Sequence, residues 1–148
     1  MSNISVVSVN ISEKRGTIKI PKESITLTTN GIENDAHAGD WHRQISILGE
    51  ESVRKFESTA GRKINYGEFA ENITTKGIVL FKTTPGDIFN IGDAVLEVTQ
   101  IGKEYHGDNS GMFSEIGSAM PKEGIFCKVI EGGVIKPGDS ITYLKKSS

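Results

Sequence analysis

The sequence predicts a mainly β protein: a closed or nearly closed β-barrel with one or a few short helices. Short apolar segments follow one another at close spacing, tight turns separate them, and only one segment has a convincing helical pattern. Glycine makes up 17 of the 148 residues and recurs in Asn-Gly, Pro-Gly-Asp and Gly-Gly groups, which are typical of turns. The length suits one domain over residues 1–148, because a chain of this size can enclose one core.

Four short strands are expected before position 50. Val7, Val9 and Ile11 alternate with polar residues, which predicts a half-buried strand. The turn at 14–16 leads from it to a second strand around 18–20, so the two are expected to form a hairpin. Two further strands are predicted, at 25–27 and at 45–48.

The rest of the chain is expected to hold one helix and four more strands. Val53, Phe56 and Ala60 have the spacing of one helical face, acidic residues open the segment, and Gly61 follows its end, where a helix C-cap is common. These signals predict a helix over 50–60. Turn-forming groups then separate strands that are predicted at 88–91, 94–101, 125–130 and 141–144.

The composition excludes several classes of protein. Lysine and arginine number 17 against 19 aspartates and glutamates, a net charge of −2, which argues against a nucleic-acid binder that acts by neutralising phosphates. No apolar run has the length of a membrane helix and the N-terminus lacks a secretory pattern, so we expect a soluble, cytoplasmic protein. The single cysteine, Cys127, cannot form an internal disulfide or a multi-cysteine zinc site.

The densest polar cluster lies at 35–43 and holds two of the three histidines. His37, Asp40 and His42 carry metal-ligating side chains, so a metal-dependent hydrolase is one hypothesis. A turn whose polar side chains face solvent is a simpler alternative. A third interpretation fits better, because cationic and hydrogen-bonding groups beside an indole ring suit a flat anionic ligand such as a phosphorylated heterocycle.

Two further polar segments, at 67–77 and 102–111, are candidate ligand contacts. Glu71 and Asn72 stand between apolar residues, so they form either a structural hydrogen-bond anchor or a ligand contact, and physical grounds favour the anchor. In the second segment, His106 can act as an acid or a base near neutral pH.

Four sequence blocks follow one another, at 31–48, 67–77, 98–104 and 120–126. The second begins Gly-Glu-Phe-Ala-Glu-Asn-Ile-Thr. Together they cover most of the chain, and in this order they resemble the MOSC domain, the family named after the C-terminal domain of molybdenum cofactor sulfurase. The resemblance implies a β-barrel of the pyruvate-kinase barrel-domain type, which agrees with the strands predicted above.

The resemblance also implies a link to the molybdenum cofactor. Members of the family either handle sulfur for this cofactor or bind it for redox work, and short bacterial forms are often linked to cofactor-biosynthesis proteins. We therefore expect molybdopterin or a similar pterin phosphate as the anionic ligand, and molybdenum cofactor biosynthesis proteins or molybdoenzymes as partners. The desulfurase part of the sulfurases is absent from this sequence, so no pyridoxal phosphate is expected on the chain.

One position departs from the family pattern. The family usually has a cysteine shortly after the third block, where this sequence has Tyr105, and a phenol cannot carry a persulfide. A sulfur-transfer enzyme would therefore need Cys127 as its carrier. That cysteine alternates with Ile125 and Val129 on an apolar strand face, so we expect it to be buried and inert.

The preferred hypothesis is thus a binding or carrier module for molybdopterin or a similar pterin phosphate, ahead of sulfur transfer through Cys127. Arg43 and Lys103 would hold the phosphate. The three polar segments are expected to converge on one face of the barrel, because one shared ligand explains all three. The resemblance and the residues together give the expected cofactor contacts as His37, His42, Arg43, Glu71, Asn72, Lys103, Tyr105 and His106, with His106 and Cys127 the candidate catalytic residues.

Overall fold

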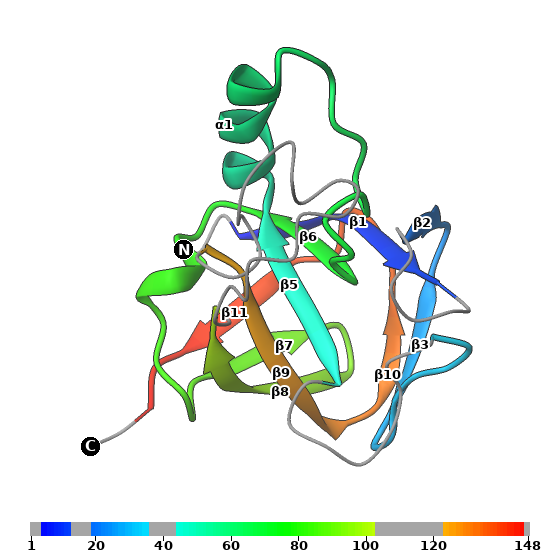
Figure 1. Cartoon of the computed structure of the whole chain (residues 1–148). Helices are drawn as coiled ribbons and strands as arrows, with labels where there is room; N and C mark the ends of the chain where they lie inside the picture. The colour runs from blue at the N-terminus through cyan, green and yellow to red at the C-terminus, as the bar shows by residue number, and fades with distance from the viewer. Residues whose placement is uncertain (1–3, 13–18, 36–43, 103–122, 147–148) are drawn as a thin grey trace.

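The fold is built mainly from strands, as the sequence predicts (Figure 1). It is known from a computed structural model, which describes residues 4–12, 19–35, 44–102 and 123–146. The elements in chain order are β1 (Ser5–Ile11), β2 (Ile20–Lys22), β3 (Ile25–Thr28), β4 (Gly31–Ile32), β5 (Ile45–Gly49), α1 (Glu50–Ala60), β6 (Ile73–Lys76), the 3-10 turn η1 (Leu80–Lys82), β7 (Ile88–Ile91), β8 (Ala94–Ile101), β9 (Ile125–Glu131), β10 (Gly133–Ile135) and β11 (Ile141–Leu144).

Eight strands form one curled sheet in the order β11-β7-β8-β9-β5-β6-β1-β2 (Figure 1). Strands β1 and β11 lie near opposite ends of this order, yet hydrogen bonds join them. The N–H of Val6 donates to the carbonyl of Asp139 at 2.8 Å, and the N–H of Ile141 donates to the carbonyl of Ile4 at 2.9 Å. These bonds bring the sheet back on itself and give it a barrel-like form.

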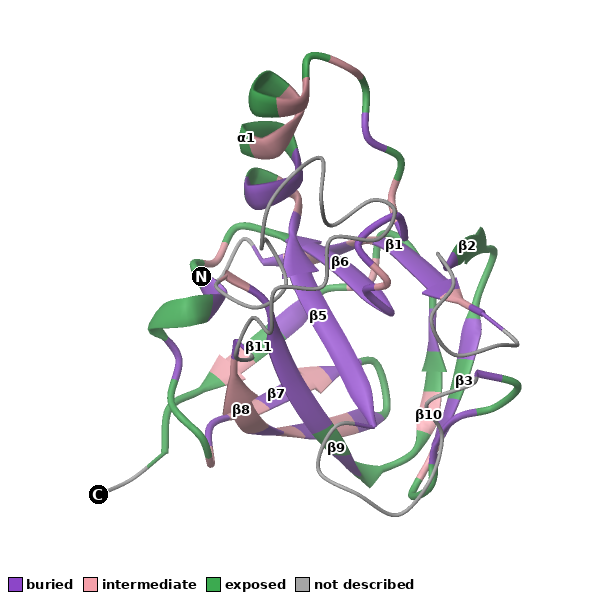
Figure 2. Ribbon diagram, in the orientation of Figure 1, coloured by how far each residue is buried: buried purple, intermediate pink, exposed green. Residues whose placement is uncertain are grey.

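A second sheet, with the order β10-β3-β4, covers the same core. Ile25 and Leu27 of β3 and Ile135 of β10 are buried in one apolar cluster with residues of the large sheet. Figure 2 shows buried residues along β5 and most of β1 and β9, while exposed residues lie in the loops, on β2 and over much of α1. The alternation that predicted β3 and β8 is therefore the alternation between core and surface.

Helix α1 carries the chain from β5 to β6, which run parallel. Its bounds are those predicted, and Gly61 caps it in the left-handed region with φ 71°, donating its N–H to the carbonyl of Glu57 at 2.9 Å. Val53 is buried, and the ring of Phe56 packs edge-on against Phe69 with centroids 5.9 Å apart. The narrow apolar face of the helix thus covers a second, smaller apolar cluster.

One expectation about side-chain direction is wrong. On β1, Val7 and Ile11 are only half-buried while Ser8 is buried, because the register shifts between Val6 and Ser8 and turns the strand. At β2, Ile20 is 51% exposed, whereas Lys19, which directly precedes the strand, is buried because polar partners inside the fold hold it. The antiparallel pairing of β1 with β2 is confirmed, and the predicted turn at 14–16 lies outside the described residues.

Three short strands were not predicted. They are β4, β6 and β10, which contain glycine, threonine or lysine and carry no run of alternating apolar residues. Neighbouring strands define them, since each pairs with a longer or more apolar one. In the described part of the chain, no helix combines the length and the apolar character that crossing a membrane requires.

Candidate functional site

The structure describes three of the predicted site residues, Glu71, Asn72 and Cys127. The first two end the loop 61–72 and are buried, whereas Cys127 lies in the apolar core. The expected convergence of the three polar segments on one face stays a prediction. The remaining predicted residues lie outside the described residues: His37, Asp40, His42, Arg43, Lys103, Tyr105 and His106.

Asn72 ties the start of β6 to two other strands. Its side-chain Nδ2 donates to the carbonyl of Asn10 at 3.2 Å, and its Oδ1 accepts from the N–H of Ser46 at 3.0 Å and from the Ser46 hydroxyl at 3.2 Å. Its backbone N–H donates to the carbonyl of Ser46 at 2.9 Å, and its own carbonyl accepts from the N–H of Asn10 at 2.7 Å. The hydrogen-bond anchor that physical grounds favoured is therefore present, and it joins β1, β5 and β6.

Glu71 is fully buried, and its two carboxyl oxygens differ in their contacts. Its Oε2 accepts from the N–H of Gly67 and from the hydroxyl of Thr74, both at 2.9 Å, whereas Oε1 has no hydrogen-bond partner among the described residues. Burial raises the pKa of Glu71 to about 7, because the charged form loses its hydration and the hydrogen bonds only partly compensate. The group can therefore exchange a proton near neutral pH.

Lys19 and Asp35 form a buried ion pair that sequence analysis missed. The lysine Nζ lies 2.8 Å from Asp35 Oδ1, and the two side chains are 1% and 0% exposed. The same Oδ1 accepts from the N–H of Ser12 at 3.1 Å. Burial lowers the pKa of Lys19, and the carboxyl groups of Asp35 and Glu71 oppose that change. A lysine between two isoleucines of a predicted strand carries no sequence signal for such a pair, because alternation assigns it to the surface.

Lys19, Asp35 and Glu71, which we term the buried charge cluster, connect separate parts of the chain. The N–H of Lys19 donates to the carbonyl of Gly67 at 2.9 Å, next to the residues that Glu71 holds. Gly67 has φ 92°, and a Cβ there would lie 2.2 Å from the carbonyl oxygen of Lys19, so only glycine fits this close approach. Residue 35 opens the first predicted polar segment and 67–72 belongs to the second, so Lys19 brings these two together.

Cys127 lies at the centre of the large sheet. It pairs with Ile45 of β5 and with Val98 of β8, is 0% exposed, and belongs to the main apolar cluster. Burial, and next the charge of Glu97, raises the pKa of the thiol far above its usual value. The predicted burial of this cysteine is confirmed.

No group of three His, Cys, Asp or Glu side chains able to hold a metal ion is found in the described ranges. All three histidines lie outside those ranges, so the metal-dependent hydrolase built on His37, Asp40 and His42 remains a hypothesis.

These features define a barrel-like β protein. Its apolar core encloses Cys127, and the buried polar residues Glu71 and Asn72 directly precede β6, the strand that follows helix α1. The MOSC domain family model matches residues 34–142, which include Asp35, Glu71, Asn72 and Cys127. The chain therefore belongs to the MOSC domain family, which is associated with the molybdenum cofactor.

Solved structures share this fold. The crystal structure of the YuaD protein from Bacillus subtilis has a TM-score of 0.82 at 17% identity, with 97% of each chain covered. YiiM from Geobacillus stearothermophilus has a TM-score of 0.71 at 21% identity, covering 96% of this chain and 75% of that one. YiiM from Escherichia coli has a TM-score of 0.60 at 21% identity, covering 98% and 70%. A comparison with curated protein sequences found no match.

Proposed function

We propose that this chain is a binding or carrier module for molybdopterin or a similar pterin phosphate. Membership of a family associated with the molybdenum cofactor supports this class of ligand. Arg43 and Lys103 are the proposed phosphate contacts, and the other proposed contacts are His37, His42, Tyr105 and His106. When bound, the cofactor would supply metal-based redox chemistry, and molybdoenzymes or cofactor-biosynthesis proteins would exchange it with this chain.

The burial of Cys127 is the observation that carries this proposal over sulfur transfer. A sulfur carrier needs a thiolate that a donor and an acceptor can both reach. Cys127 is the only cysteine in the sequence, it is 0% exposed, and burial raises the pKa of its thiol far above neutrality. Tyr105 occupies the usual family cysteine position and cannot carry sulfur. Binding therefore agrees with the chemistry of this chain better than transfer does.

Glu71 and Asn72 fit such a site as supports rather than as direct contacts. The amide of Asn72 is engaged on both sides by backbone groups of β1 and β5. Because burial raises the pKa of Glu71 to about 7, its carboxyl is largely neutral below that pH and does not repel a nearby phosphate. Together the two residues hold the 67–72 segment in one shape, which preorganisation of a ligand site requires.

The test is the binding of molybdopterin to Arg43→Ala and to a control, Lys82→Ala, which removes one positive charge from an exposed position. Molybdopterin released anaerobically from a purified molybdoenzyme is mixed with each variant, and the pterin that co-elutes with protein is measured by fluorescence. A lost charge-assisted contact, of about 1.5–3 kcal/mol, corresponds to a tenfold to hundredfold weaker affinity for Arg43→Ala alone. Equal affinities for the two variants, at equal thermal stability, would remove Arg43 from the site.

A second measurement separates binding from sulfur transfer. The native protein is incubated with a persulfide donor at pH 7 and analysed by intact-mass spectrometry, with Cys127→Ala as the control. The binding module takes up no sulfur. A persulfide on Cys127 that passes to an acceptor would replace the proposal with sulfur transfer.

A further inference from the structure

A groove opens between the edge strand β2 and the loop that follows α1. Its volume is about 370 Å³, within the range of small-molecule sites. Ile20 and Pro21, both exposed, form one wall, and half-buried Tyr66 contributes apolar surface to the other, whose lining also includes the buried Ile64. None of its lining residues belongs to the proposed pterin contacts. The described lining residues are Lys19, Ile20, Pro21, Arg54, Lys63, Ile64, Asn65, Tyr66 and Glu68.

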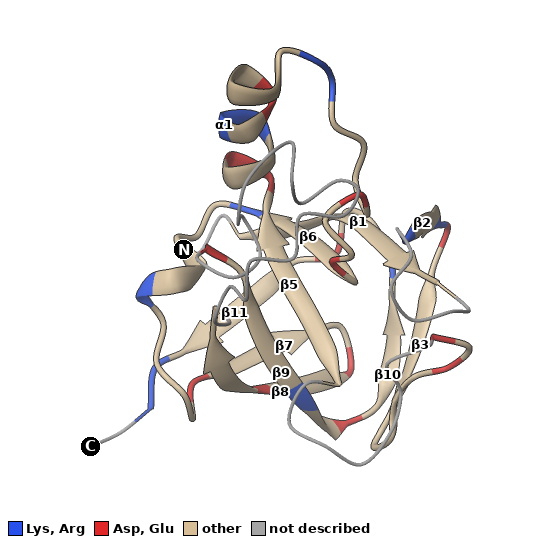
Figure 3. Cartoon of the chain, in the orientation of Figure 1, with Lys and Arg blue, Asp and Glu red and all other residues tan. Residues whose placement is uncertain are grey.

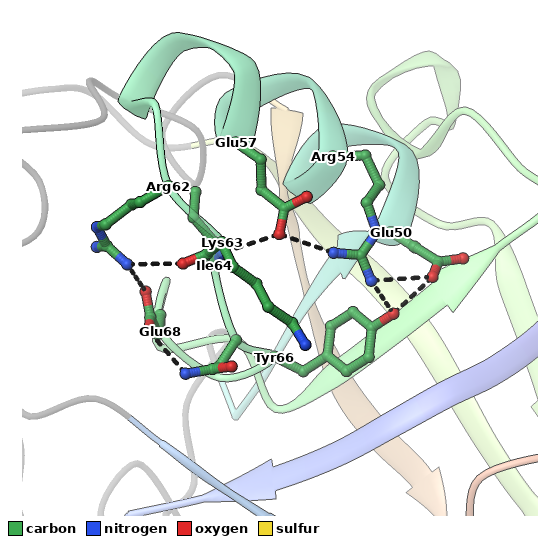
Figure 4. A network of polar contacts seen from close by, with 9 residues as sticks. Glu50, Arg54, Glu57, Arg62, Lys63, Ile64, Tyr66 and Glu68 are labelled. Atoms are coloured by element: carbon green, nitrogen blue, oxygen red, sulfur yellow. Dashed lines mark hydrogen bonds and ion pairs between the residues drawn. The ribbon is translucent and has the colours of Figure 1, made fainter.

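The loop wall of this groove is held in place by a polar network (Figure 4). Glu57 Oε2 accepts from the N–H of Ile64 at 2.8 Å and from Arg54 Nη1 at 2.9 Å, which fixes the loop to the helix. The guanidinium of Arg54 also donates to the Tyr66 hydroxyl and lies 5.2 Å from the centroid of its ring. Because these contacts order the wall in the free protein, a ligand would meet a largely formed surface.

Acidic and basic residues alternate along α1 and the loop after it (Figure 3). Most charged residues in the described lining are ion-paired: Arg54 with Glu50 and Glu57, and Lys19 with Asp35. Glu68, an acidic residue of the described lining, is paired with Arg62 at 3.1 Å. Lys63 lines the groove and makes no ion pair within the described part of the chain, and Figure 4 shows its side chain extending toward Tyr66.

We propose that this groove binds a small ligand that carries one anionic group, a carboxylate or a phosphate, on a flat apolar body. Lys63 supplies the charge for the anionic group. The flat body lies against Tyr66, Ile20 and Pro21, where it covers apolar surface that is otherwise exposed to water. The proposal goes beyond pterin binding at Arg43 and does not depend on it.

The test is a titration of the ¹⁵N-labelled protein followed by amide chemical shifts. Benzoate and phenyl phosphate are the two anionic probes, benzamide is the neutral probe, and inorganic phosphate lacks the flat body. At least one anionic probe is expected to bind in the millimolar range and to shift the amides of residues 64–66 and Ile20. The tighter of benzoate and phenyl phosphate identifies the anionic group.

Two variants make the result decisive. Lys63→Gln is expected to weaken binding of that probe about threefold to fivefold, the range of an exposed charge pair, whereas Lys22→Gln, an exposed lysine of β2 that does not line the groove, leaves it unchanged. Benzamide or inorganic phosphate binding as tightly as the anionic probe would overturn the proposal. Equal effects of the two variants, or shifts confined to other residues, would overturn it as well.

Discussion

Glu71→Gln is expected to remove much of the pH dependence of stability between pH 4.5 and 7. The carboxyl is fully buried, Oε2 accepts from Gly67 and Thr74, and Oε1 has no hydrogen-bond partner in the part of the chain that the structure describes. Glutamine keeps one carbonyl oxygen to accept both hydrogen bonds and cannot ionise. The substitution therefore preserves the shape of the loop and removes the charge.

Whether stability rises or falls with pH follows from the direction of the pKa change. The pKa of Glu71 rises from 4.5 to about 7 on folding, so the native state holds a proton that the unfolded state has lost in this pH window. Stability of the natural protein therefore falls as pH rises from 4.5 to 7 and stays lower above 7. At about 1.4 kcal/mol for each pH unit, the loss amounts to about 3 kcal/mol.

The assay is thermal or urea unfolding of both proteins at pH 5 and at pH 8, with Glu33→Gln, an exposed carboxylate, as the control. The amide group that replaces Oε1 affects the variant at both pH values. The informative quantity is therefore how the stability difference between the variant and the natural protein changes from pH 5 to pH 8. That difference is expected to move in favour of Glu71→Gln by about 3 kcal/mol between pH 5 and pH 8. A constant difference would show that Glu71 does not titrate in this window, and the linkage argument would fail.

Three other substitutions test the interior. Cys127→Ala is expected to lower stability by about 1 kcal/mol and to leave molybdopterin binding intact, and a thiol reagent should label native Cys127 far more slowly than the urea-unfolded chain; equal rates would contradict its burial. Asn72→Ala leaves buried groups of β1 and β5 without partners, so urea unfolding should show a loss of about 3 kcal/mol, and a loss below 1 kcal/mol would refute the anchor. Lys19→Met removes the buried ammonium that faces Asp35 and should lose about 3–5 kcal/mol, most of it recovered when Asp35→Leu is added; no recovery would argue against the pair.

The longer strands and the helix could be predicted because their cause is local. In β8, Leu96 and Val98 are buried and alternate with Glu97 and Thr99, and in β9 the buried Ile125, Cys127 and Val129 occupy every second position. The helix signals also agree with one another, since the acidic first turn, the apolar face and Gly61 all mark the same segment. In contrast, β4 and β10 have two and three residues, and only their pairing with β3 makes them strands.

The candidate site was harder to predict, because its contacts join residues that lie far apart in the sequence. Glu71 and Asn72 were identified because polar residues between apolar ones need partners, but which partners they find depends on strands far away in sequence. Nothing in the sequence marks Lys19 as buried, because the pattern of apolar residues gives no information about ion pairs. Only the three-dimensional arrangement brings Asp35 within 2.8 Å of it.

The buried charge cluster is therefore a reason to expect that the first two polar segments face one site. Charges inside a protein are tolerated only at close contact with good geometry, so Lys19 and Asp35 restrict where the chain can run far more narrowly than an apolar contact of the same area would. Lys19 fixes Asp35 on one side and, through its N–H, Gly67 on the other. The chain that continues from Asp35 toward Arg43 thus starts beside the segment that holds Glu71 and Asn72. A ligand held by Arg43 would then meet a preorganised wall, and loosening Lys19 should weaken its binding without removing any residue that touches it.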